Sequence, residues 1–389
     1  MKNHSDCVHL EHIARTHFTM TVNFNNMMPN EHLRELCVAG LAKRYENSPL
    51  FETALLRLGD ELGVIAKIGI ANEFLKIVNL FRFANEQGIY GTARGSFAGS
   101  MVSYSLNFSH VCPLEFDLFF ERFLHEFRDA LPFVEFDFEA ERFDEVRDYL
   151  STHELADTAS LPIGVYGPQQ LTNLSRAINI IQKRSGCHVD PYLFPLDDED
   201  TYDLLKQGAI TETPLFEDKG IRELLMRIKP EHFRDIIAAI ALYRPGPIEL
   251  GMVDQYIDIK HNRRQAIYLH PATQDFLEET NGVMIYQEQM MRILNRLGNI
   301  PLADSYECIK TICKKQHEKI VYYRNDFIEG AGANGLDKKQ AAEVFEEIEK
   351  FAQYGFCKSH STVYARILYM LAYIKTHCSK EFAAAQNAA

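Results

Sequence analysis

The sequence predicts an α+β protein, and three observations lead to this prediction. Residues 131–139, LPFVEFDFE, alternate apolar and acidic side chains with the period of a β-strand. Residues 51–86 carry long helical runs, so helix and strand are mixed in the first part of the chain. Beyond about residue 205 the patterns are almost wholly helical. We therefore expect two domains, one at 1–205 and one at 206–389.

The second domain is predicted to contain a series of helices at residues 201–207, 219–228, 233–242, 283–297 and 338–351. Pro245 and Pro247, in the sequence YRPGP, are expected to stop the third helix after Tyr243. Proline has no backbone N–H and restricts the residue before it, which explains this expectation. Residues 197–199, after the turn FPL, mark a plausible seam between the domains.

Composition indicates an ordinary soluble globular protein, with 46% hydrophobic and 24% charged residues among 389. The sequence has no membrane-length apolar run and no signal-peptide core, so a cytoplasmic location is expected. Its eight cysteines form no CxxC pair, which argues against a zinc site. The net charge of −13 argues against nucleic acid binding over the whole surface. Contact with DNA would therefore require a local basic cleft.

The predicted strand at 134–138 would have one apolar face and one face of carboxylates, formed by Glu135, Asp137 and Glu139. Carboxylates two residues apart on one strand face repel each other unless water or a cation neutralises them. Oxygen ligands of this kind are what Mg²⁺ prefers. The alternative is an edge strand whose acidic face is merely solvated.

A second motif lies about forty residues upstream, in ARGSFAGS at residues 93–100. Gly95 and Ser96 are expected to form a tight turn that opens a helix, whose free N–H groups suit phosphate. Nucleotidyl transfer needs both parts. The turn would hold the triphosphate, and the carboxylates would hold two Mg²⁺ ions that activate the attacking hydroxyl and stabilise the leaving pyrophosphate.

Several motifs in order resemble the bacterial C-family DNA polymerases, the polymerase III alpha subunits. They include EQGIYGTARGSFAGSMVSYSLNFSHVCPLEFDLFFERFL, DIIAAIALYRPGPIELGMVDQYIDIKH, GVMIYQEQMMRIL and EKFAQYGFCKSHSTVYA, and the resemblance covers most of residues 31–385. It implies a palm of the polymerase-beta-like nucleotidyltransferase type, with a mixed sheet, followed by helical fingers. It also implies template-directed DNA synthesis with a primer-template and dNTPs as substrates, and possible contacts with other polymerase subunits.

The resemblance also assigns roles to residues. Glu135 and Asp137 match the catalytic carboxylates that bind Mg²⁺, and Glu139 is a speculative third ligand. Residues that match nucleotide-binding positions are Gly95, Ser96, Arg122, Arg128, Arg244, Lys314, Lys315 and His360. The alternatives from the residues alone stay open: the lysine pair as solvated surface charge, and the histidine as a structural residue.

The chain departs from the family at several positions. Glu135 replaces the first Asp, and the later Lys-x-Asp motif falls on Val165 and Gly167, so two charges are lost. Only residues 138–166 separate the matching palm strands, which is too short for the thumb. In the fingers, a glutamine and an arginine pair are replaced by Leu215, Ile309 and Lys310.

Three interpretations follow from these matches and departures. The chain is a divergent nucleotidyltransferase, or an inactive palm-fingers relic that binds nucleotide, DNA or a partner. As a third possibility, it is a piece of a longer or split polymerase, which would leave apolar surface exposed where the missing parts belong.

Overall fold

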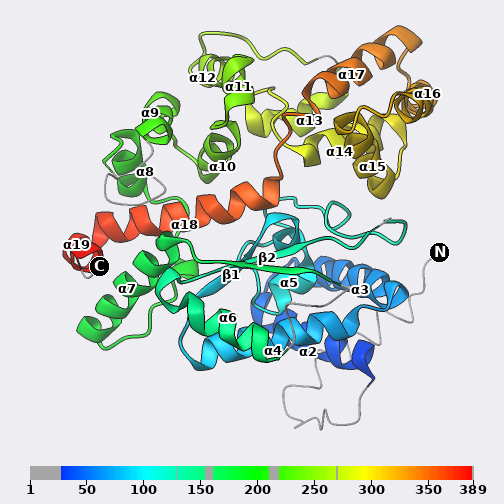
Figure 1. Cartoon of the computed structure of the whole chain (residues 1–389). Coiled ribbons are helices and arrows are strands. Elements are labelled where there is room, and N and C mark those ends of the chain that lie inside the picture. The colour runs from blue at the N-terminus through cyan, green and yellow to red at the C-terminus, as the bar shows by residue number, and fades with distance from the viewer. Residues whose placement is uncertain (1–27, 129, 154–160, 210–218, 269, 388–389) are drawn as a thin grey trace. The chain divides into compact units, whose positions relative to one another are not determined.

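The computed structural model of the protein describes residues 28–128, 130–153, 161–209, 219–268 and 270–387 (Figure 1). The chain forms two compact units, of which the first ends at Ser175 and the second begins at Arg176. The division falls within helix α7 (Gln169–Ser185). The assignment of palm-like and finger-like domains with a boundary at residue 205 stays a prediction.

The first unit is built around a three-stranded sheet of β1 (Gly91–Arg94), β2 (Val134–Phe138) and β3 (Ile163–Tyr166) (Figure 1). Strand β1 pairs antiparallel with β2, and β3 pairs parallel with it, so the sheet is mixed. The predicted strand at 134–138 and the α+β class are confirmed. Because β2 lies in the centre of the sheet, the alternative of a solvated edge strand is wrong.

Helices surround this sheet: α2 (Pro29–Arg44), α3 (Phe51–Ile68), α4 (Ala71–Glu86), α5 (Met101–Ser105) and α6 (Phe143–Thr152), with 3₁₀ turns η2 (Gly95–Gly99) and η3 (Ala140–Arg142). The helical run predicted at 51–86 is interrupted at Gly69, whose φ of 80° is left-handed. Glycine is the residue that most readily ends a helix in this conformation, so the run becomes two helices.

The apolar face of β2 forms part of the core of the first unit. Val134, Phe136 and Phe138 are fully buried. The ring of Phe136 lies 5.2 Å from that of Phe81 on α4 and 5.8 Å from that of Phe97 in η2, both edge-to-face. Edge-to-face ring pairs add to the burial of apolar area. This packing fixes β2 and leaves its acidic face as the side that carries chemistry.

The second unit is helical among its described residues. Its helices are α8 (Glu199–Lys206), α9 (Lys219–Ile228), α10 (Phe233–Leu242), α11 (Pro245–Glu249), α12 (Met252–Lys260), α13 (Gln274–Leu277), α14 (Gln287–Gly298), α15 (Leu302–Cys313), α16 (His317–Ala333), α17 (Lys338–Phe351), α18 (Lys358–His377) and α19 (Ser379–Asn387). Short 3₁₀ turns are η4 (Pro191–Leu193), η6 (Pro271–Thr273) and η7 (Glu278–Thr280). None of the described helices is long and apolar enough to cross a membrane.

Two predicted helix boundaries can be compared with the structure. Helix α10 ends at Leu242, as expected, but Pro245 then starts the short helix α11, where a missing N–H costs nothing. The helix predicted from residue 283 begins only at Gln287. The preceding residues are extended because Phe356 donates to the carbonyl of Ile285 and accepts from the N–H of Gln287.

Candidate active site

Two carboxylates of β2 are held by one arginine of the neighbouring strand. Arg94 is the last residue of β1 and lies opposite Glu135 in the antiparallel register. Its Nη2 donates to Glu135 Oε1 at 3.0 Å and its Nη1 to Asp137 Oδ1 at 3.2 Å. The Asp137 side chain is fully buried, whereas that of Glu135 is 28% exposed. The guanidinium thus supplies the positive charge that a buried carboxylate requires.

The third strand completes this arrangement with an aromatic ring. Tyr166 pairs with Asp137 in the parallel register of β2 and β3. Its ring lies against the guanidinium of Arg94, with 3.8 Å from the guanidinium carbon to the ring centroid. A guanidinium over a tyrosine face is stabilised electrostatically. Each strand of the sheet therefore contributes to fixing Arg94 on the acidic face.

The predicted Gly-Ser turn lies beside the carboxylates. Gly95 has a φ of 67°, and a Cβ built on it would lie 3.1 Å from Glu135 Oε2. Glycine therefore adopts the left-handed backbone conformation without strain and lets the carboxylate approach the backbone closely. Ser96 is half-buried, and its hydroxyl makes no hydrogen bond within the described ranges. The structure thus brings together Gly95, Ser96, Glu135 and Asp137, as the sequence analysis expected.

The helix that follows the turn has no free N-terminus, and this part of the expectation is wrong. The first α-helix after the turn is α5, and its leading N–H groups, from Met101 and Val102, donate to the carboxylate of Glu61 at 2.9 and 3.1 Å. Ser100 Oγ donates to the same carboxylate at 2.7 Å, and Arg57 Nε at 2.9 Å. A buried glutamate on α3 therefore takes the place of an external anion.

Glu139 makes contacts different from those of Glu135 and Asp137. Its carboxylate accepts from the backbone N–H of Tyr90 and from the side chain of Ser175. Burial raises the pKa of Glu139 above its usual value, and these hydrogen bonds oppose that effect. Within the described part of the chain, no group of three or more His, Cys, Asp or Glu residues is arranged to hold a metal ion.

The position that matches the family's third carboxylate has little room for a side chain. A Cβ on Gly167 would lie 3.1 Å from the Cα of Ala140 and 3.2 Å from the ring of Phe143. The backbone of Ala140 cannot give way as a flexible side chain would. The strand before Gly167 carries no acidic residue. The close packing of the residue after β3 against the segment after β2 therefore disfavours a carboxylate side chain at this position.

The two palm arginines expected from the sequence lie in the segment before β2. Arg128 donates to the backbone carbonyls of Phe123 and Ala130 and so holds its own loop. Arg122 is half-buried. Contact of either residue with a nucleotide stays a prediction.

In the second unit the YRPGP and GFCKSHS motifs pack on each other. Arg244 Nε donates to the Ala241 carbonyl at 2.8 Å, and its Nη2 donates to the Tyr354 carbonyl. The guanidinium lies 4.6 Å from the ring centroid of Phe356. Burial lowers the pKa of Arg244. His360 contacts the same Phe356 ring, with 5.5 Å between centroids. Arg244 and His360 are thus brought together around one aromatic residue.

The predicted lysine pair is exposed. Lys314 follows the last turn of α15, and Lys315 has a left-handed φ of 53°. Neither side chain has an ion-pair partner among the described residues. By contrast, Lys358 of the KSHS motif is buried, and its Nζ bonds both carboxylate oxygens of Glu279 at 2.7 and 2.9 Å. Lys314 and Lys315 therefore remain available for an anionic ligand.

The sequence analysis missed three residues of the first unit: Arg94, Tyr166 and Glu61. Arg94 directly precedes the predicted Gly-Ser turn, and its position before a turn that faces an acidic strand was an available signal. The contacts of Tyr166 and Glu61 depend on strand register and helix packing, for which the sequence had no local pattern.

Comparison with known proteins identifies the class to which this fold and site belong. The family model described as "Bacterial DNA polymerase III alpha NTPase domain" matches residues 31–166. The model described as "Bacterial DNA polymerase III alpha subunit finger domain" matches residues 170–335. The chain therefore consists largely of two domains of bacterial DNA polymerases. It belongs to the family of bacterial DNA polymerase III alpha subunits.

Curated relatives with the name DNA polymerase III subunit alpha agree with this result. The protein of Halalkalibacterium halodurans is 28% identical over 484 residues, which cover 93% of this chain and 43% of the relative. That of Escherichia coli K12 is 28% identical and covers 85% of the chain and 40% of the relative. That of Aquifex aeolicus is 26% identical, with 90% and 43% covered.

The chain spans about two fifths of the length of these relatives. The alignment with the Halalkalibacterium protein is 484 residues long, whereas this chain has 389. That relative therefore carries segments inside the matched region that have no counterpart here.

Proposed function

We propose that this chain is a member of its family that binds DNA or nucleotides, and that its first unit does not catalyse nucleotidyl transfer while Arg94 is in place. One observation carries the proposal: a single guanidinium pairs with both Glu135 and Asp137. These are the two residues that match the catalytic carboxylates of the family.

The residues on the acidic face meet only part of what Mg²⁺ requires. Glu135 and Asp137 are of the right donor type, because Mg²⁺ is bound by one or two carboxylates together with substrate phosphates. However, the guanidinium already bonds one oxygen of each carboxylate, and it would repel a divalent cation at the same position. The packing around Gly167 is tight, so a carboxylate side chain at this position would require the backbone of Ala140 to shift. The site does not fit a two-metal centre, and we derive no step through Mg²⁺.

Binding is supported by residues outside this ion pair. Gly95 and the half-buried Ser96 form a turn next to Glu135, and Lys314 and Lys315 are exposed cations. The relatives are named as DNA polymerases, which makes DNA and nucleotides the ligands of choice. The proposal also includes three expectations from the sequence. The first unit is a palm and the second a fingers domain, the protein is cytoplasmic, and other polymerase subunits are partners. A missing thumb is consistent with the shorter chain in the matched region.

Template-directed DNA synthesis is the second candidate. It is favoured by the assembly of Gly95, Ser96, Glu135 and Asp137 at one place. For this function Arg94 would have to leave both carboxylates and release them to metal ions. The two candidates therefore differ in whether the ion pairs of Arg94 persist when substrate binds.

Primer extension separates the two candidates. The full chain is incubated with a primed DNA template and four dNTPs, in Mg²⁺ and separately in Mn²⁺, beside an Asp137→Ala variant. Circular dichroism establishes that both proteins are folded, and fluorescence anisotropy measures binding of the primer-template. The proposal predicts binding without extension. Extension by the wild type that disappears in Asp137→Ala would reject the proposal in favour of synthesis.

A further inference from the structure

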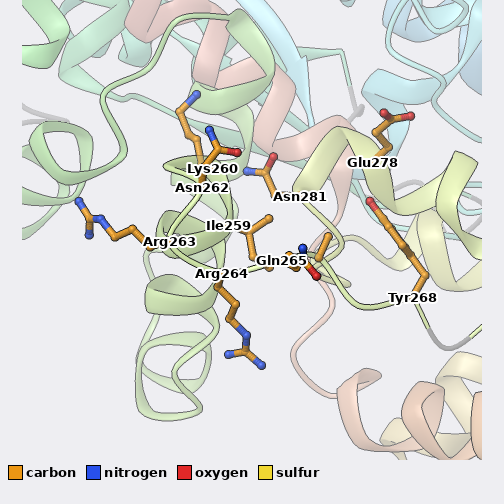
Figure 2. Close-up of a pocket in the computed structure, with 10 residues that line it drawn as sticks. Ile259, Lys260, Asn262, Arg263, Arg264, Gln265, Tyr268, Glu278 and Asn281 are labelled. Carbon is orange, nitrogen blue, oxygen red and sulfur yellow. The ribbon is translucent and has the colours of Figure 1, made fainter.

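The second unit contains a polar pocket. Its residues lie far along the chain from the strands and carboxylates of the first unit. The pocket has a volume of about 720 Å³ and is lined by eight residues at the end of α12 and just beyond it, together with Glu278 and Asn281 (Figure 2). The eight are Ile259, Lys260, Asn262, Arg263, Arg264, Gln265, Ala266 and Tyr268. This volume lies within the range of small-ligand sites. Three cations, one carboxylate, three amides and one phenol are among its lining groups.

The walls of the pocket are held by defined contacts. Lys260 donates through Nζ to Asp235 Oδ2 at 2.8 Å, and its side chain is only 10% exposed. On the other wall Gly282 has a φ of 79°, and a Cβ there would lie 3.1 Å from Ala266 and 3.5 Å from the Tyr268 ring. The segment that carries Ala266 and Tyr268 therefore packs directly on a glycine turn. These contacts fix the shape of the pocket.

Two cations of the pocket are available to a ligand. Arg263 lies 3.4 Å from Asp258 in an exposed pair, with 64% of its side chain accessible. An exposed pair of this kind contributes little and is easily exchanged. Arg264 is exposed and forms no ion pair within the described ranges. The Lys260 charge, by contrast, is neutralised by Asp235. Arg263, in an exchangeable pair, and Arg264 are therefore adjacent cations that a ligand can contact, in a chain with a net charge of −13.

The pocket has two chemically different sides. Figure 2 shows the side chains of Arg263 and Arg264 extending outward in different directions, whereas Tyr268 and Glu278 lie on the opposite side. Partial burial, and after it the negative charge of Glu278, raise the pKa of the Tyr268 hydroxyl, which stays neutral. An anion is therefore favoured at the arginine side, and an uncharged planar group at the tyrosine side.

We propose that this pocket binds single-stranded nucleic acid, with Arg263 and Arg264 on successive phosphates and Tyr268 stacked on an unpaired base. Guanidinium groups bind phosphate through paired N–H donors, and every base has a face that stacks on an aromatic ring. Gln265 and Asn281 offer amides to the edge of the base. Because the two arginine side chains point in different directions, a strand with successive phosphates suits them better than a single nucleotide. The inference rests on the proposed function, that the chain binds DNA or nucleotides, and assigns a site for this binding in the second unit that uses neither Glu135 nor Asp137.

The test measures binding of a fluorescein-labelled oligothymidylate to the full chain by anisotropy, as a function of salt. The double variant Arg263→Ala/Arg264→Ala is compared with Lys338→Ala/Lys339→Ala, which removes the same charge from exposed positions of α17. We expect at least tenfold weaker binding for the arginine variant and no change for the lysine variant. The slope of log K against log salt should fall by about 1.4, from two phosphate contacts at about 0.7 each.

A second variant separates stacking from charge. Tyr268→Ala should weaken binding at least fivefold and leave the salt slope unchanged, because base stacking involves no counterion release. Equal affinity for a duplex of the same length would overturn the inference, since paired bases cannot reach the tyrosine. Wild-type binding by the arginine variant, or no oligothymidylate binding by the wild type, would overturn it as well. Binding of the primer-template by the full chain, together with either of these results, would overturn the inference and leave the proposed function standing.

Discussion

Arg94→Met removes the guanidinium that joins β1 to β2 and keeps a side chain of similar length. The substitution breaks the ion pair with the fully buried Asp137, the partly exposed pair with Glu135 and the contact with the Tyr166 ring. Removal of one partner of a buried pair costs about 3–5 kcal/mol, whereas an exposed pair contributes at most about 1 kcal/mol. We expect the local stability of the sheet to fall by about 3–5 kcal/mol.

Hydrogen exchange of peptides that cover β1 and β2 measures this change, because it reports the stability of one region without assuming how the two units unfold. A loss of 3–5 kcal/mol corresponds to exchange about 10² to 10⁴ times faster. The matched control is Lys67→Met in the same unit, whose pair with Glu126 is 67% and 38% exposed. The control should change exchange by less than about fivefold.

A double variant shows whether the effect comes from the buried charge. Arg94→Met/Asp137→Asn should exchange more slowly than Arg94→Met alone, since a neutral amide needs no cation. The reasoning would be refuted if Arg94→Met behaved like the Lys67→Met control, or if Asp137→Asn made the Arg94 variant still less stable.

Three further predictions concern the same unit. Glu61→Ala removes the acceptor of two backbone N–H groups and one hydroxyl at the start of α5, so the free energy of unfolding should fall by about 3 kcal/mol in chemical denaturation; an unchanged midpoint would contradict the contacts. Gly95→Ala places a Cβ at a left-handed φ and 3.1 Å from Glu135, and should cost about 1–2 kcal/mol in the same assay. Glu139 has a raised pKa in the folded state, so its contribution is fully present below the unfolded pKa and is lost as pH rises through the folded value. The melting temperature of the wild type relative to Glu139→Gln should therefore decline from pH 4 upward, and a rise would contradict the direction of the shift.

Elements with a strong local pattern were predictable from the sequence. The strand at 134–138 and the helices at 219–228, 233–242 and 338–351 lie where expected, because apolar spacing and local end signals define them. The helix expected at 283–297 is present as α14, but it begins only at Gln287, since Tyr286 pairs with Phe356 in a contact between distant segments. Such long-range pairing has no signature in the local sequence.

The sequence allowed most residues of the site to be predicted, but not the group that neutralises its carboxylates. Gly95, Glu135 and Asp137 were expected to meet, and they do, because β1 runs antiparallel to β2 and ends beside it. What neutralises the carboxylates depends on which side chain faces them across the register, and this is set by strand pairing. Arg94 fills that position, where the sequence analysis expected a divalent cation.

The central claim is that Arg94 takes the place of metal ions on the acidic face. Mn²⁺ binding measured by electron paramagnetic resonance tests it most directly, with the wild type compared with Glu135→Gln and with Arg94→Met. The account predicts that Glu135→Gln binds as many Mn²⁺ ions as the wild type, and that Arg94→Met binds at least one more. A Mn²⁺ ion bound by the wild type and lost in Glu135→Gln would contradict it.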